Sequence, residues 1–139
     1  MRIVPSLLLV GAVGLALACN RENLSTAGPH KVIISLTCDN DGGKIGVQPW
    51  RVRSLKSESI KWTVAQNNTT VSLEPKDPAQ WPFVSAPPIT VSNANPVTSS
   101  DFKNLTPGDS IFPYKVTGVC NHHGQMNKVV LDPDMIIPN

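Results

Sequence analysis

The seven residues from Cys120 to Met126 read Cys-Asn-His-His-Gly-Gln-Met, and three of their side chains are ligands for soft metal ions. A thiolate from Cys120, an imidazole from His123 and a thioether from Met126 stand at Cys-x2-His-x2-Met spacing, and such ligands select copper. The motif follows an apolar, strand-like run, so one tight turn would bring the three groups around a single ion. Taken alone, this pattern indicates a copper site.

The remaining residue types give no sign of a catalytic site. The three histidines have no obvious acidic partner, and the serines lack the surroundings of a nucleophile elbow. The sequence has no zinc-protease motif and no glycine-rich loop for phosphate. The formal net charge is only +2, with charged residues at 16% and no basic cluster. We therefore expect neither an enzyme nor a nucleic-acid-binding protein.

The first residues have the pattern of an export signal. Arg2 is followed by an apolar run over residues 7–18 that stops at Cys19. The run is shorter than the roughly 20 residues that a transmembrane helix needs, and one early cation with small residues at the end is typical of a secretory signal. Residues 15–19, Leu-Ala-Leu-Ala-Cys, also resemble a bacterial lipoprotein signal, in which the cysteine is lipidated and becomes the new N-terminus.

We expect residues 1–18 to be a signal peptide of the lipoprotein type and Cys19 to carry lipid. Two alternatives stay open, namely simple secretion after cleavage behind Ala18 and retention of the segment as an anchor. All three export the domain to an oxidising compartment where disulfides persist, and the lipid-anchored one places it on the periplasmic side of a bacterial membrane. Residues 19–30 are then a polar tether, and residues 31–139 form the domain.

The domain has the pattern of an all-β protein. Val32, Ile34, Leu36 and Cys38 alternate with other residues, as a strand with one buried face requires. The expected strands are residues 32–38, 45–55 with an interruption at Pro49, 59–65, 69–74, 89–91, 111–120 and 128–131, and a last segment at 132–137. The 13 prolines, the turn clusters and the lack of helical periodicity indicate a Greek-key β-sandwich of seven or eight strands.

The order of these elements resembles the cupredoxin family, which includes plastocyanin, amicyanin and pseudoazurin. Three segments carry the resemblance, which covers about residues 31–137. Gly46-Val47-Gln48-Pro49 with Ile60-Lys61-Trp62 looks like the second and third strands of that family. Residues 114–120 look like the strand that leads to the copper cysteine, and residues 120–126 with 129–131 look like the amicyanin-type ligand loop and closing strand. The resemblance implies a β-sandwich with a type 1 copper site.

A type 1 site needs a further histidine, which the resemblance places near residues 67–70. This chain has Asn-Asn-Thr-Thr there. His30 precedes the first strand and would lie about 25 Å away, because eight residues of strand rise about 3.3 Å each. His122 is adjacent to His123 and would project differently from the same turn. One equatorial imidazole is therefore missing from the set that defines blue copper.

The cysteines offer a competing interpretation. If lipid occupies Cys19, Cys38 and Cys120 remain, and the resemblance puts the strand ends that carry them at the same pole of the sandwich. We therefore expect a Cys38–Cys120 disulfide, which needs Cα atoms about 4.4–6.8 Å apart. Because a disulfide sulfur is not a thiolate, this bridge excludes a copper site made of Cys120, His123 and Met126. Copper binding and free thiols stay as alternatives.

Two aromatic residues in a proline-rich stretch are a candidate patch for docking a partner. Trp81 and Phe83 flank Pro82, and aromatic side chains anchor protein interfaces. Alternatively, they fill one edge of the sandwich. Trp50 and Trp62 lie in strand-like segments and are expected in the core.

Without a metal, His122 and His123 are expected to be turn residues that are solvated or hydrogen-bonded to the backbone, and Met126 is expected to fill the core. Asp132 and Asp134 flank Pro133 and are expected in a turn rather than at a cation site. The sequence thus predicts a non-catalytic, membrane-tethered, cupredoxin-like domain without copper. Its role would be structural or would involve a protein partner in an envelope or electron-transfer complex, and a type 1 copper electron carrier is the alternative.

Overall fold

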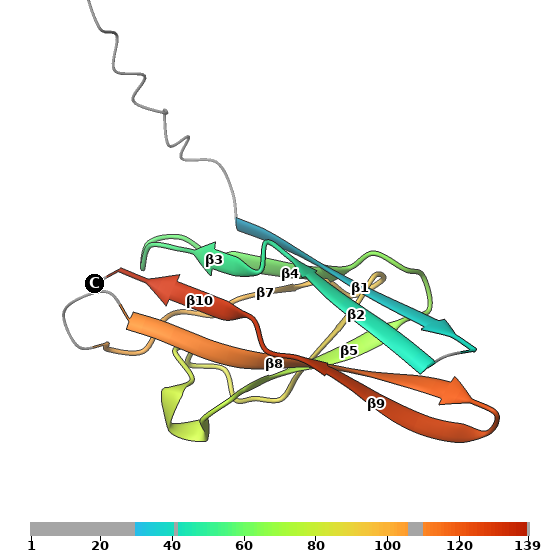
Figure 1. Cartoon of the computed structure of the whole chain (residues 1–139). Helices are drawn as coiled ribbons and strands as arrows, with labels where there is room; N and C mark the ends of the chain where they lie inside the picture. Colours follow the sequence, from blue (N-terminus) through green and yellow to red (C-terminus); the bar gives the residue numbers. More distant parts are fainter. Residues whose placement is uncertain (1–29, 41, 106–109, 139) are drawn as a thin grey trace, which may run out of the picture.

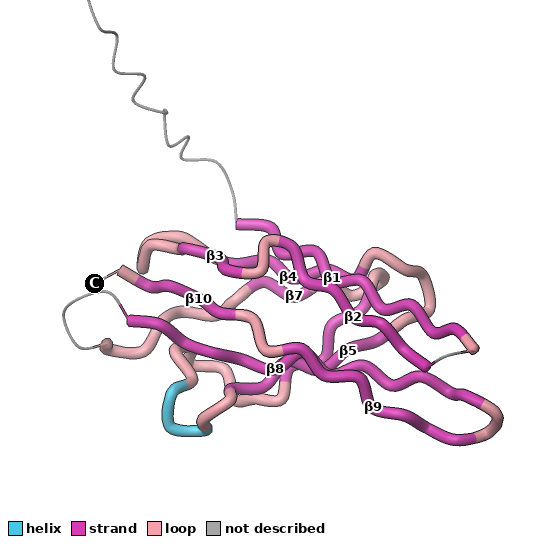
Figure 2. Tube along the Cα trace, in the orientation of Figure 1, coloured by secondary structure: helices cyan, strands magenta, loops and turns pink. Residues whose placement is uncertain are grey.

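The computed structural model describes residues 30–40, 42–105 and 110–138, and almost all of their regular secondary structure is strand (Figure 2). In chain order these are β1 (His30–Asp39), β2 (Gly42–Gln48), β3 (Arg51–Arg53), β4 (Ile60–Val64), β5 (Thr70–Pro75), β6 (Ile89–Ser92), β7 (Val97–Thr98), β8 (Ser110–His122), β9 (Gln125–Leu131) and β10 (Asp134–Ile137), with a short 3-10 turn η1 (Pro78–Gln80) after β5. The expected signal peptide, Cys19 and the tether up to Pro29 lie outside the described residues.

The strands form two layers, as the all-β sandwich prediction requires (Figure 1). The first sheet has four strands in the order β2-β1-β4-β7. The second has six, with β3-β10-β8-β5-β6 in one path and β9 beside β8. The β1–β4 and β3–β10 pairs are parallel, and the other pairs are antiparallel.

The alternation seen in the sequence sets the faces of the strands. In β8, Phe112, Tyr114, Val116, Gly118 and Cys120 are buried, while the residues that alternate with them are partly or fully exposed. In β1, Val32, Ile34 and Leu36 are buried in the same way. This follows from the pleat of a strand, which points successive side chains to opposite faces. The predicted apolar face of β8 is confirmed, and that of β1 is confirmed as far as Leu36, beyond which Cys38 is exposed.

The centre of the core is Trp62 on β4, which is fully buried. Its ring meets Phe83 edge-on at a centroid distance of 5.7 Å and Tyr114 at 6.4 Å. Its Nε1 donates a hydrogen bond of 3.4 Å to the hydroxyl of Tyr114. Aromatic pairs favour this edge-to-face arrangement because the positive ring edge meets the negative face. The core position predicted for Trp62 is confirmed.

The prediction that Trp50 lies in the core is wrong, since its side chain is 49% exposed. The stretch 45–55 is two strands in different sheets, β2 and β3, rather than one interrupted strand. Pro49 has no N–H for the sheet ladder, so the ladder ends before it and Trp50 falls on the crossing between layers. The backbone carbonyl of Trp50 instead accepts a hydrogen bond from the N–H of Asp134.

Of the two interpretations of Trp81 and Phe83, burial excludes the exposed docking patch and bears out the alternative that they fill the sandwich. Trp81 is 3% exposed and Phe83 is fully buried. Their rings stack edge-on at 5.2 Å, and the Nε1 of Trp81 donates to the carbonyl of Ser85 at 2.7 Å. The chain between β5 and β6 folds Phe83 against Trp62 and Trp81 against Phe83, because burial removes a large apolar area from water. They complete the core and offer no exposed surface.

Candidate functional site

The predicted tight turn in the ligand loop is present, and it closes the β8–β9 hairpin. His122 pairs with Gln125, so the loop consists of His123 and Gly124. Both have positive φ, 49° and 77°, as the two central residues of a type I′ turn require. The side chain of Asn121 accepts a hydrogen bond of 3.0 Å from the N–H of Gly124. The hairpin thus supplies an acceptor for the N–H of Gly124 from its own side chains.

This turn does not bring the three soft ligands together. Cys120 pairs with Asn127, whereas Met126 pairs with Asn121. Because directly opposed residues of an antiparallel pair share a face and neighbours along a strand alternate, Cys120 and Met126 lie on opposite faces. Cys120 is 1% exposed and Met126 is 70% exposed. The core position expected for Met126 in a metal-free loop is therefore wrong as well.

The sulfur of Cys120 forms a disulfide with Cys38, with the Cα atoms 5.4 Å apart. Cys38 lies near the end of β1 and Cys120 near the end of β8, so the bridge joins the two sheets at one pole. The packing around it is close: a side-chain carbon added to Gly43 would come within 2.6 Å of the Cys120 sulfur and 2.4 Å of Val129. The expected bridge leaves no thiolate at position 120.

The histidines do not supply a second equatorial ligand. His30 lies at the far end of β1 from Cys38, and its Nε2 is 2.7 Å from a carboxylate oxygen of Glu58. The pKa of Glu58 is held below its usual range, first by the N–H of Leu55 and then by His30. The segment 67–70 does lie at the Cys120 pole, since Val71 pairs with Gly118, but it contains no histidine.

His122 and His123 form a close pair at the hairpin turn, with ring centroids 4.2 Å apart. The Nε2 of His122 is buried and has no hydrogen-bond partner among the described residues. Within those residues, no group of three or more His, Cys, Asp and Glu side chains is arranged to hold a metal ion. Since Cys120 is bridged and Met126 points away, the residues of this loop do not fit a type 1 copper ion.

The two aspartates near the C-terminus engage cations of the chain itself. Asp132 lies 3.1 Å from the Nζ of Lys76, in the link between β9 and β10. Asp134 opens β10 and accepts two hydrogen bonds from the guanidinium of Arg51, at 2.5 and 3.2 Å. This second pair ties the parallel strands β3 and β10 together. Each carboxylate has a protein partner, so neither is placed as part of a cation site.

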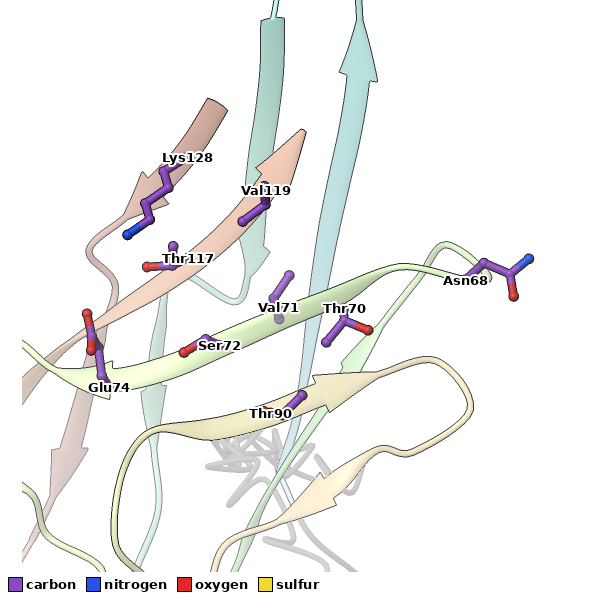
Figure 3. Close-up of a pocket in the computed structure, with 9 residues that line it drawn as sticks. All are labelled: Asn68, Thr70, Val71, Ser72, Glu74, Thr90, Thr117, Val119 and Lys128. Carbon is purple, nitrogen blue, oxygen red and sulfur yellow. The ribbon is translucent and has the colours of Figure 1, made fainter. Parts of the chain in front are cut away.

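A groove on the outer face of the second sheet is the concave surface that sequence reasoning missed (Figure 3). We call it the hydroxyl groove. It has a volume of about 590 Å³ and is lined by Asn68, Thr70, Val71, Ser72, Glu74, Thr90, Thr117, Val119 and Lys128. The alternation of polar residues in strands 69–74 and 111–120 was the signal for it, but only the register shows that these residues face one another.

No helix among the described residues is long and apolar enough to cross a membrane. Comparison of the chain with protein-family models, with curated proteins and with solved structures finds no match.

Proposed function

We propose that this chain is an exported, lipid-anchored β-sandwich protein of cupredoxin-like type that has neither a catalytic nor a copper function. Its role is structural or interaction-based at a bacterial envelope, as an accessory part of a membrane complex. The observation that carries this proposal is the Cys38–Cys120 disulfide. The bridge occupies the sulfur that would supply the thiolate of the copper motif, and disulfides persist in exported proteins rather than in the reducing cytosol.

The resemblance to cupredoxins supports the same proposal. It places the ends of the strands that carry Cys38 and Cys120 at one pole, and the bridge brings those two ends together. The chain keeps a ligand-like loop at that pole, but the loop turns its thioether away from the bridged cysteine. A sandwich of this kind, without its metal ligands, retains a rigid framework with loops and sheet faces for binding a partner.

Thiol counting with a copper titration tests this function against a copper electron carrier. The mature protein is unfolded without reductant and titrated with a thiol reagent, and the folded protein receives Cu(II) beside it. We expect no thiol from Cys38 or Cys120 and no intense visible absorption. Two thiols together with a strong thiolate-to-copper band would overturn the proposal. The variant Cys38→Ala is the matched control, because it must release one thiol.

Mass spectrometry of the mature protein tests the anchor separately. We expect the mass of the chain from Cys19 onward plus acyl groups, and we expect the variant Cys19→Ala to lose them. A mature mass without lipid would exclude the membrane anchor, while the thiol count would still decide the copper question.

A further inference from the structure

The floor of the hydroxyl groove is a row of three hydroxyl side chains on adjacent strands. Ser72 on β5 stands directly opposite Thr90 on β6 and directly opposite Thr117 on β8. Opposed residues of a sheet share a face and lie about 4.5–5.5 Å apart. Among the described residues, none of these three hydroxyls makes a hydrogen bond, and neither does the side chain of Asn68 or Thr70. Their donors and acceptors face open solvent.

Charged residues flank this row, and their sum is positive. On one side, Glu74 and Lys115 form an ion pair of 3.1 Å, which leaves no net charge. Lys128 on β9 lines the groove and has no ion-pair partner in the part of the chain that the structure describes. In Figure 3 its side chain extends toward Thr117, and Asn68 lies at the opposite end of the groove. The groove therefore offers one unneutralised cation beside a set of neutral hydrogen-bonding groups.

From this arrangement we propose that the hydroxyl groove binds an acidic glycan, a carbohydrate chain that carries carboxylate groups. The inference rests on the interaction role proposed above and gives that role a ligand class. Hydroxyl and amide groups both donate and accept hydrogen bonds, as sugar hydroxyls do, so the two surfaces are complementary. Lys128 supplies the countercharge for a carboxylate.

The size and lining of the groove favour a glycan over other ligands. The distance from β9 to β6 covers three interstrand spacings, roughly 14 Å, which a single small anion does not fill. A peptide partner would need pockets for aromatic or aliphatic anchors. Val119 is the one apolar side chain in the lining that is half-exposed, at 44%. The threonine methyl groups and Val119 offer shallow apolar contact, which suits the C–H faces of sugar rings.

Calorimetric titration of the mature protein with two oligosaccharides tests this inference. Polygalacturonate oligomers carry a carboxylate on each sugar, and dextran oligomers of equal length carry none. We expect the acidic oligomer to bind more tightly and its affinity to fall as salt is raised, since the Lys128 contact is exposed and screened. Lys128→Gln should weaken polygalacturonate binding about fivefold and leave dextran binding unchanged.

The double variant Ser72→Ala/Thr117→Val tests the hydroxyl row. It should weaken binding of both oligomers, roughly 25-fold if each lost hydrogen bond accounts for about fivefold. Lys31→Gln and Thr63→Val are matched controls, because both residues face outward from the other sheet. These controls should bind like the unaltered chain, and all variants should keep its melting temperature.

Three results would overturn the inference: no binding of polygalacturonate, equal losses in the Lys31 and Lys128 variants, or full affinity in the Ser72/Thr117 variant. None of them would change the thiol count or the mass of the mature protein. Failure of the glycan site is therefore distinguishable from failure of the proposed function.

Discussion

Removing the Cys38–Cys120 bridge should produce a large loss of stability whose size follows from its place in the chain. The two cysteines are 82 residues apart in sequence. In the chain-entropy treatment, a cross-link that closes a loop of this length lowers the entropy of the unfolded state enough to stabilise the fold by about 4.5 kcal/mol. The bridge also joins the two sheets at the pole where β2 packs on β9, and it is the one disulfide among the described residues.

The perturbation is the double variant Cys38→Ala/Cys120→Ala, compared with the unaltered chain by urea and thermal unfolding. For a domain of about 110 residues, an unfolding entropy of about 2.1 cal/mol/K per residue converts this loss into a melting temperature roughly 15–20 °C lower. The urea m-value should rise, because the unfolded chain without the cross-link exposes more surface. Reductant should destabilise the unaltered chain by a similar amount and leave the double variant unchanged.

The single variants separate the cross-link from packing. Cys120 is buried and Cys38 is exposed, so truncation of Cys120 alone should cost more than truncation of Cys38 alone. If the free energy of unfolding of the double variant were within about 1 kcal/mol of that of the unaltered chain, the bridge would not restrict the unfolded state as the chain-entropy treatment requires. Equal sensitivity of both proteins to reductant would lead to the same conclusion.

Three further changes probe the core. Phe83→Ala should destabilise the fold by about 3–5 kcal/mol, measured by urea unfolding, and a loss under 1 kcal/mol would mean that this aromatic is at the surface after all. Gly43→Ala should cost about 1–3 kcal/mol, because its new carbon would lie 2.4 Å from Val129 and 2.6 Å from the sulfur of Cys120; an unchanged urea midpoint would contradict that close packing. Burial raises the pKa of Tyr114 to about 12 in the folded protein, whereas its pKa in the unfolded chain is about 10. The folded state therefore holds this proton more tightly, and its stability is highest below pH 10. About 2–3 kcal/mol of unfolding free energy should be lost as the pH rises from 10 to 12. Tyr114 is the only tyrosine, so phenolate absorbance reports its titration directly. Tyr114→Phe should remove the loss of stability at alkaline pH. A titration midpoint near pH 10 in the folded protein would refute the raised pKa.

The strands and their faces were predictable because the signal is local. A strand has a period of two, so the apolar positions of β1, β4 and β8 can be read from alternation alone. The core position of Trp62 follows from that pattern. The same logic misplaced Trp50, since the pattern does not show that the chain changes sheets after Pro49.

The candidate copper site shows where spacing along the chain ceases to be informative. Cys-x2-His-x2-Met spacing is compatible with a loop whose three side chains surround one ion. It is equally compatible with a two-residue hairpin turn that places Cys120 and Met126 on opposite faces of the sheet. The register of β8 against β9 decides between them. Register depends on the turn geometry at His123 and Gly124 and on which face of each strand is buried.

The fold class and the faces of the main strands could be read from the sequence, and the pairing of Cys38 with Cys120 followed from a resemblance. The burial of Trp81 and Phe83, the exposure of Met126, and the row of Ser72, Thr90 and Thr117 emerge only in the folded chain. The physical reason is the range of the interactions. Alternation and turn chemistry act between residues close in sequence, whereas burial and cross-strand contact depend on which distant segments pack together, and that is set by the whole sandwich.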